Sequence, residues 1–117
     1  GVLNPAPWYC KSMQIIQSGS ASEYIVHNEA RRISNAVEYV ARWAKNRDIA
    51  LYLGEFGAYE KAPMDSRIAW TKTVRTACES RNINWGYWEL VAGFGIYDTQ
   101  QQQFRNGLYR ALIPNRR

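Results

Sequence analysis

Two short apolar segments, each preceded by an amphipathic helical pattern, constrain the fold of this chain more than any other feature. The segments span residues 49–56 and 83–90. The helical patterns cover residues 29–46 and 64–80, and a short closing helix is expected near residues 104–113. The order helix–strand–helix–strand–helix is typical of α/β folds, in which helical crossovers join parallel strands. The sequence therefore predicts an α/β fold with parallel strands.

Both long helical patterns have an apolar face at the three-and-four spacing. Asn28 is a suitable N-cap for the first, and Asp65 and Ser66 suit the positive first turn of the second. The first face comprises Ile33, Val37, Val40, Ala41 and Ala44, and the second comprises Trp70, Val74, Ala77 and Cys78. Trp43 and Trp70, on these helices, are expected to be core side chains.

Residues 1–27 show no clear pattern, and they are expected to form an irregular segment before the structured residues 28–114. Pro5 and Pro7 exclude a helix interior, and residues 18–22 have the composition of a loop. At 117 residues the chain is at most one domain, spanning 1–117. The first residue is Gly, and a signal peptide's basic and apolar regions are lacking, so we expect a mature, trimmed or excised chain.

Several classes of partner are not expected. The net charge of +5 comes from Lys and Arg spread along the chain, whereas nucleic-acid binding needs a clustered stripe and a recognisable module. No apolar run approaches the roughly 18 residues of a membrane helix. Cys10 and Cys78 are able to pair, although a buried thiol is the simpler interpretation of Cys78. With His27 as the single histidine, no zinc site is expected, and no metal.

The two helix–strand units resemble each other. Arg47-Asp48-Ile49 matches Arg81-Asn82-Ile83 at an offset of 34 residues, and the same offset carries Glu55 onto Glu89. Each Glu lies near the end of an apolar strand. Ligands of parallel β/α folds bind at the carboxyl ends of the strands. An unpaired carboxylate buried there is costly, so a Glu at such a place usually has a function. The alternative for each Glu is a structural ion pair with an arginine.

Three motifs carry a resemblance to a known family. They are Leu51-Tyr52-Leu53-Gly54-Glu55-Phe56-Gly57, then Trp85-Gly86-Tyr87-Trp88-Glu89, then Gly93-Phe94-Gly95-Ile96-Tyr97-Asp98. In this order they resemble the last quarter of the catalytic domain of glycoside hydrolase family 5, the cellulase family. The likeness runs from about residue 28 to residue 114. It implies a (β/α)8 barrel.

The resemblance also implies roles for individual residues. Glu55 matches the nucleophile at the end of barrel strand seven, and Trp88 matches the tryptophan that stacks on the sugar at the cleavage point. The implied reaction is retaining hydrolysis of a β-1,4-linked glucan, without metal or cofactor, by two carboxyl groups about 5–5.5 Å apart. Further candidate sugar-binding aromatic residues are Trp85, Tyr87, Trp8 and Tyr9. Because polymeric substrates lie outside the cell, a secreted or periplasmic protein is expected.

The chain also departs from the family pattern. It lacks the Asn-Glu-Pro motif of the acid/base, since Asn28-Glu29 is followed by Ala30, and His27 does not replace the missing His-x-Tyr. A complete barrel needs about 250 residues, so the chain is expected to supply half a barrel.

A half barrel exposes strand edges and an apolar face, which favours self-association. We therefore expect a homodimer or larger homo-oligomer in which Glu55 of one subunit and Glu89 of the other share a site. Trp88 and Glu89 are adjacent, so both serve one site only if the strand end is irregular. The alternative function is an inactive remnant that binds carbohydrate.

Overall fold

The computed structural model describes residues 23–115, with side chains from residue 29 onward. The elements are α2 (Glu23–Lys45), β1 (Tyr52–Phe56), α3 (Met64–Glu79), β2 (Asn84–Tyr87), β3 (Tyr97–Asp98), β4 (Gln103–Phe104) and α4 (Asn106–Leu112). Strands β1 and β2 pair in parallel, which confirms the predicted strand direction, while β3 and β4 form a separate antiparallel pair that was not predicted.

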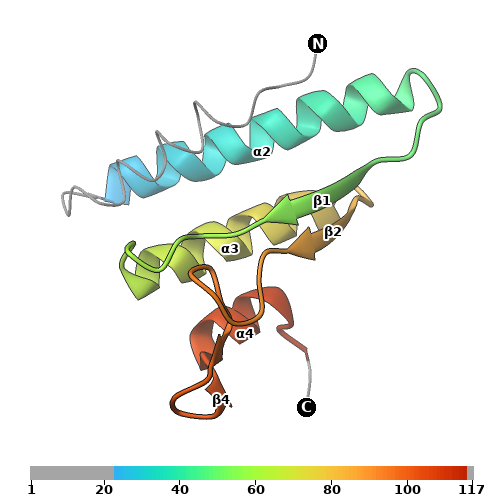
Figure 1. The fold of residues 1–117 in the computed structure, drawn as a ribbon. Helices are drawn as coiled ribbons and strands as arrows, with labels where there is room; N and C mark the ends of the chain where they lie inside the picture. Colours follow the sequence, from blue (N-terminus) through green and yellow to red (C-terminus); the bar gives the residue numbers. More distant parts are fainter. Residues whose placement is uncertain (1–22, 116–117) are drawn as a thin grey trace.

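Helix α3 lies at the centre of the fold. It packs against α2 on one side and α4 on the other, and the sheet of β1 and β2 covers the same helix (Figure 1). One apolar core joins these elements. Its buried members are Ile33, Phe56, Ala58, Trp70, Val74, Ala77, Cys78, Ile83 and Leu112. The main sheet therefore has one face on the helices and one face without a covering element among the described residues.

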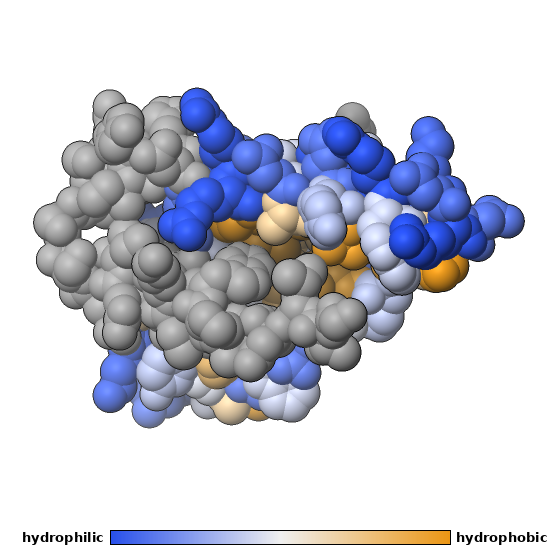
Figure 2. Space-filling view, turned by 90° about the horizontal axis from the view of Figure 1, so that it is seen from above, coloured by the Kyte–Doolittle hydropathy of each residue, from blue (hydrophilic) through white to orange (hydrophobic). Residues whose placement is uncertain are grey.

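The predicted apolar faces are largely confirmed. Ile33 and Ala44 of α2 are buried, as are all four predicted face residues of α3, including the free thiol of Cys78. Trp43 is a correction, because its side chain is 43% exposed and the Arg47 guanidinium lies 4.5 Å from its ring centroid. This cation–π contact lies at the C-terminal end of α2. Strongly hydrophilic side chains gather along one side of the face seen in Figure 2.

Several element boundaries differ from the prediction. Helix α2 begins at Glu23, so Asn28 lies inside it and the irregular segment does not reach residue 27. No Gly or Pro lies between these two residues, and extending a formed helix adds one hydrogen bond per residue. Strand β1 begins at Tyr52 rather than residue 49, because the Ile49 amide still bonds the helix end at Ala44.

The two helix–strand turns have the same construction. Asp48 and Asn82 adopt left-handed φ values of 52° and 59°. The following amides, of Ile49 and Ile83, donate to the carbonyls of Ala44 and Cys78, five residues earlier. This is the Schellman ending, with Asp and Asn at the position that glycine usually takes. The repeat detected in the sequence is therefore a repeated turn.

The described residues do not close a barrel. They contribute two parallel strands, whereas a (β/α)8 barrel has eight. Within residues 23–115 the expectation of half a barrel is therefore too large, and the parallel sheet amounts to a quarter. Each of the two strands has one neighbour and one open edge in this sheet.

Candidate active site

Glu55 lies on the open face of the main sheet. Leu53 and Phe56 both pack toward the helices, although they are three residues apart, because the β1–β2 register shifts between them. This irregularity leaves Glu55 exposed at the carboxyl end of β1, as predicted for a strand-end carboxylate. The chain thus presents the carboxylate at the strand end where parallel β/α folds bind ligands.

The Glu55 carboxylate has no protein partner in the described part of the chain. The ion pairs between described residues join Arg42, Arg75, Arg81 and Arg105 to other carboxylates. Within residues 23–115, Glu55 therefore forms no structural ion pair with an arginine, which was the alternative interpretation of this residue. An exposed carboxylate free of hydrogen bonds and salt bridges is available to a ligand.

Trp88 lies beside the end of β1. Its amide donates at 2.7 Å to the carbonyl of Phe56, the residue that follows Glu55. The Trp88 side chain is 49% exposed. A Cβ atom on Gly57 would lie 1.9 Å from the Trp88 carbonyl oxygen, so only glycine permits this approach of the two chain segments. The backbone therefore holds Trp88 close to the Glu55 end of β1.

Glu89 does not occupy the place in β2 that Glu55 occupies in β1. Strand β2 ends at Tyr87, and Glu89 lies in the loop that follows, joined to Trp88 by a cis peptide bond. This loop is closed by hydrogen bonds from Ile96 to the Glu89 carbonyl and from Tyr97 to the Leu90 carbonyl. The 34-residue offset predicted that Glu55 and Glu89 occupy equivalent strand positions. This prediction is wrong, because the loop hydrogen bonds at Glu89 and Leu90 replace the expected end of the strand. The chain is irregular at Trp88 and Glu89, which is the condition for both residues to serve one site.

Trp85 and Tyr87 lie on the helix side of the sheet. Their rings contact Phe56 at centroid distances of 5.6 and 5.5 Å, and the Trp85 indole donates to the Glu79 carboxylate. The Tyr87 hydroxyl donates to the Phe94 carbonyl at 2.7 Å. Strand alternation therefore directs both side chains away from the face of Glu55, and the structure does not support them as sugar contacts.

Tyr52 was not predicted as a site residue, yet it shares the open face with Glu55. It is 66% exposed, and a Cβ atom on Gly86 would lie 2.8 Å from its hydroxyl oxygen. A Cβ atom added to Gly54 would lie 3.5 Å from the Tyr52 ring, an ordinary van der Waals contact. The phenol therefore extends over both strands where they lack side chains. Alternation along β1, which puts Tyr52 on the side opposite Leu53, was the signal in the sequence.

The remaining predicted residues lie elsewhere. Trp8, Tyr9 and Cys10 are outside the described residues, and so is the side chain of His27. Between residues 23 and 115, no group of three His, Cys, Asp or Glu side chains is placed to hold a metal ion. No helix in this range is long and apolar enough to cross a membrane.

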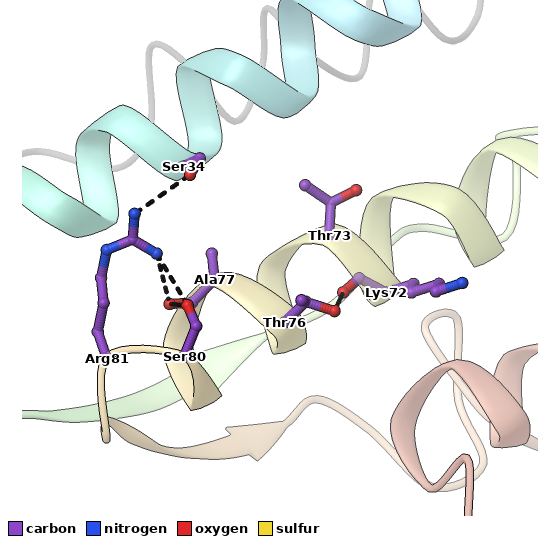
Figure 3. A pocket seen from close by; sticks show the side chains of 7 residues that line it. All are labelled: Ser34, Lys72, Thr73, Thr76, Ala77, Ser80 and Arg81. Atoms are coloured by element: carbon purple, nitrogen blue, oxygen red, sulfur yellow. Dashed lines mark hydrogen bonds between the residues drawn. The ribbon is translucent and has the colours of Figure 1, made fainter.

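A groove between α2 and α3 is separate from the open sheet face. It is lined by Ser34, Lys72, Thr73, Thr76, Ala77, Ser80 and Arg81 (Figure 3). The hydroxyls of Thr73 and Thr76 in α3, and that of its C-cap residue Ser80, donate to carbonyls of α3, and the Arg81 guanidinium donates to Ser34, Ser80 and Glu38. The groove is therefore a polar seam between two helices, whose groups largely satisfy one another.

Solved structures identify the proteins that this chain is similar to. An endoglucanase is 44% identical over 72% of this chain, with a TM-score of 0.70, and a hyperthermophilic endo-β-1,4-glucanase solved with substrate is 42% identical over 74%, also at 0.70. Endoglucanase Cel5A from Thermotoga maritima is 31% identical over 93%, at 0.72. The chain spans 27%, 28% and 36% of these three structures. No protein-family model and no curated protein matches the sequence.

Proposed function

Because the chain corresponds to part of a glycoside hydrolase family 5 domain, we propose that it carries the nucleophile of a retaining β-1,4-glucan hydrolase. The observation that supports this proposal is the Glu55 carboxylate, which is exposed and unpaired among the described residues at the carboxyl end of β1. Trp88, bonded through its amide to the residue after Glu55, is the proposed stacking platform for the sugar. Polymeric glucans lie outside the cell, so we propose that the protein acts there.

In the proposed reaction the Glu55 carboxylate attacks the anomeric carbon and forms a covalent glycosyl–enzyme intermediate. A second carboxyl group, about 5–5.5 Å away, protonates the departing oxygen and then removes a proton from the attacking water. The glycosyl–enzyme bond breaks as the water adds, which regenerates the Glu55 carboxylate. The indole of Trp88 offers a flat apolar surface to the C–H face of the ring.

The acid/base group is proposed to come from additional polypeptide. Glu89 of a second copy is the candidate in this chain, because it is half-buried beside Trp88 rather than fixed in the sheet. One further copy brings the described parallel strands to four, and eight are needed to close a barrel. We therefore propose that more polypeptide than a dimer of the described residues surrounds the working site.

The first experiment separates an enzyme from a binding module. A soluble β-1,4-glucan is incubated with the parent, with Glu55→Gln and with Glu60→Gln, which removes an exposed carboxylate five residues later. We expect new reducing ends with the parent and with the Glu60 variant, and none with the Glu55 variant. Binding without turnover by the parent would instead support the carbohydrate-binding function. Equal turnover by all three proteins would contradict the role of Glu55.

The second experiment tests a site shared between copies. Glu55→Gln and Glu89→Gln are assayed alone and after mixing under conditions that exchange subunits. A shared site predicts two inactive variants whose mixture regains activity, because some assemblies then contain one intact pair. Full activity of Glu89→Gln alone, or a monomeric mass in solution for an active parent, would contradict the shared site.

A further inference from the structure

Arg67 is a buried cation that no carboxylate neutralises among the described residues. It lies in the first turn of α3 with 3% of its surface exposed. The ion pairs of the described residues involve other arginines. Burying a charged group is costly, and the long apolar side chains that fill such a position avoid the cost. The guanidinium therefore needs an explanation other than packing.

Two main-chain carbonyls accept hydrogen bonds from Arg67. The Nε atom donates to the Ala58 carbonyl at 3.1 Å, and an Nη atom donates to the Gly95 carbonyl at 3.4 Å. These carbonyls belong to chain segments that are 37 residues apart in the sequence. A guanidinium suits this task because its donors have a fixed planar arrangement, whereas an ammonium is a single point.

The two bridged segments are those that carry the proposed site. Ala58 lies three residues after Glu55, where the chain leaves β1. Gly95 lies in the loop that begins with Trp88 and Glu89. Two backbone hydrogen bonds, from Trp88 to Phe56 and from Glu60 to Gly93, join the same segments at 2.7 Å each. Arg67 thus supports this junction from the helix side of the sheet.

We propose that Arg67 is a positioning residue, which fixes the segment carrying Trp88 and Glu89 relative to the end of β1 that carries Glu55. It touches neither carboxylate in the described contacts and acts through the main chain. Any effect on catalysis rests on the proposed function. The positioning itself is a property of the fold and is measurable without substrate.

Arg75 provides a matched control. It is also buried, with 7% of its surface exposed, and it lies two helical turns further along α3. Its Nε atom donates to the Ala111 carbonyl of α4, away from the proposed site. Replacing either arginine by Met removes a buried guanidinium from the same helix. Only Arg67→Met removes the bridge between the two segments.

The decisive measurement is amide hydrogen exchange in the full chain. We expect Arg67→Met to speed exchange of the Trp88 and Glu60 amides by roughly tenfold or more relative to Arg75→Met, after scaling by global stability, because hydrogen bonds to charged groups are the stronger ones. In Arg67→Lys these amides should exchange nearly as fast as in Arg67→Met, since one ammonium does not span both carbonyls. Equal exchange in the two Met variants, or parent-like exchange in Arg67→Lys, would overturn the proposal.

A kinetic measurement tests the consequence for catalysis. If the parent hydrolyses a soluble β-1,4-glucan, Arg67→Lys should lower kcat while KM stays near the parent value, and Arg75→Lys should leave kcat unchanged. An unchanged kcat in Arg67→Met would overturn the link to catalysis. If the parent shows no turnover, the proposed function fails, and the exchange experiment still decides whether Arg67 positions the two segments.

Discussion

Gly57 is the glycine at which an added methyl group should lower the free energy of unfolding most. Its φ lies outside the left-handed region, so alanine is compatible with the backbone conformation there. The obstacle is distance, because the added Cβ would lie 1.9 Å from the Trp88 carbonyl oxygen, and real Cβ contacts essentially never fall below 3.0 Å. The two backbones must separate by about 1.1 Å, the difference between these distances.

The cost of Gly57→Ala has two parts. Overpacking typically costs about 1–3 kcal/mol, and the separation weakens the 2.7 Å hydrogen bond from Trp88 to Phe56, a loss of about 0.5–1.5 kcal/mol. The expected decrease in the free energy of unfolding is therefore roughly 1.5–4.5 kcal/mol. Urea denaturation followed by tryptophan fluorescence measures it.

Gly54→Ala is the control for this substitution. A Cβ atom at Gly54 would meet the Tyr52 ring at 3.5 Å, an ordinary van der Waals contact. Alanine restricts the unfolded chain, so this variant should be as stable as the parent or more stable by about 0.4–1 kcal/mol. Equal free energies of unfolding for the Gly54 and Gly57 variants would refute the argument that close approach, rather than general intolerance of the strand, selects glycine at residue 57.

Two further predictions concern the core and the antiparallel pair of β3 and β4. Phe56→Ala should lower the free energy of unfolding by about 3–5 kcal/mol in the same urea assay, because its 7% exposed ring contacts Trp70, Trp85 and Tyr87; a loss below 1 kcal/mol would contradict its central place. The amide of Gln101, together with other nearby donors, holds the pKa of Asp98 below its ordinary value near 3.8, so its stabilising contribution is present above that value and is lost as the pH falls through the lowered pKa. An NMR titration of the carboxyl group should show the lowered pKa, and Asp98→Asn should remove this part of the acid dependence of stability.

Helix content and strand direction could be predicted because they follow from periodicity. The apolar stripe that ends at Cys78 and the strand that ends at Phe56 are repeated patterns, and their alternation specifies parallel strands. Trp43 was misplaced because an aromatic residue on a helix is as compatible with an exposed cation–π pair as with a core. Periodicity reports which face is apolar and does not report what covers it.

The site was predicted only in part, because its geometry depends on long-range contacts. The position of Glu55 could be read from its own strand. The end of β2 at Tyr87 depends on loop bonds that local propensity does not encode, so Trp85, Tyr87 and Glu89 were placed on one continuous strand. Arg67 had no signal at all, since one arginine at the start of a helix looks like a surface residue until two distant carbonyls reach it.

The repeated helix ending has a consequence for how such a chain diversifies. Each copy consists of main-chain hydrogen bonds and one left-handed Asp or Asn, and neither depends on the residues at the far end of the following strand. A unit that keeps this ending therefore keeps the start of a strand, while the far end of the strand is free to differ: β1 carries Glu55 near its end, and β2 has no carboxylate. Within each 34-residue unit, the turn that starts the strand and the residue at the strand's end are independent. A reactive side chain can therefore be introduced at the end of a strand without changing the turn that precedes it.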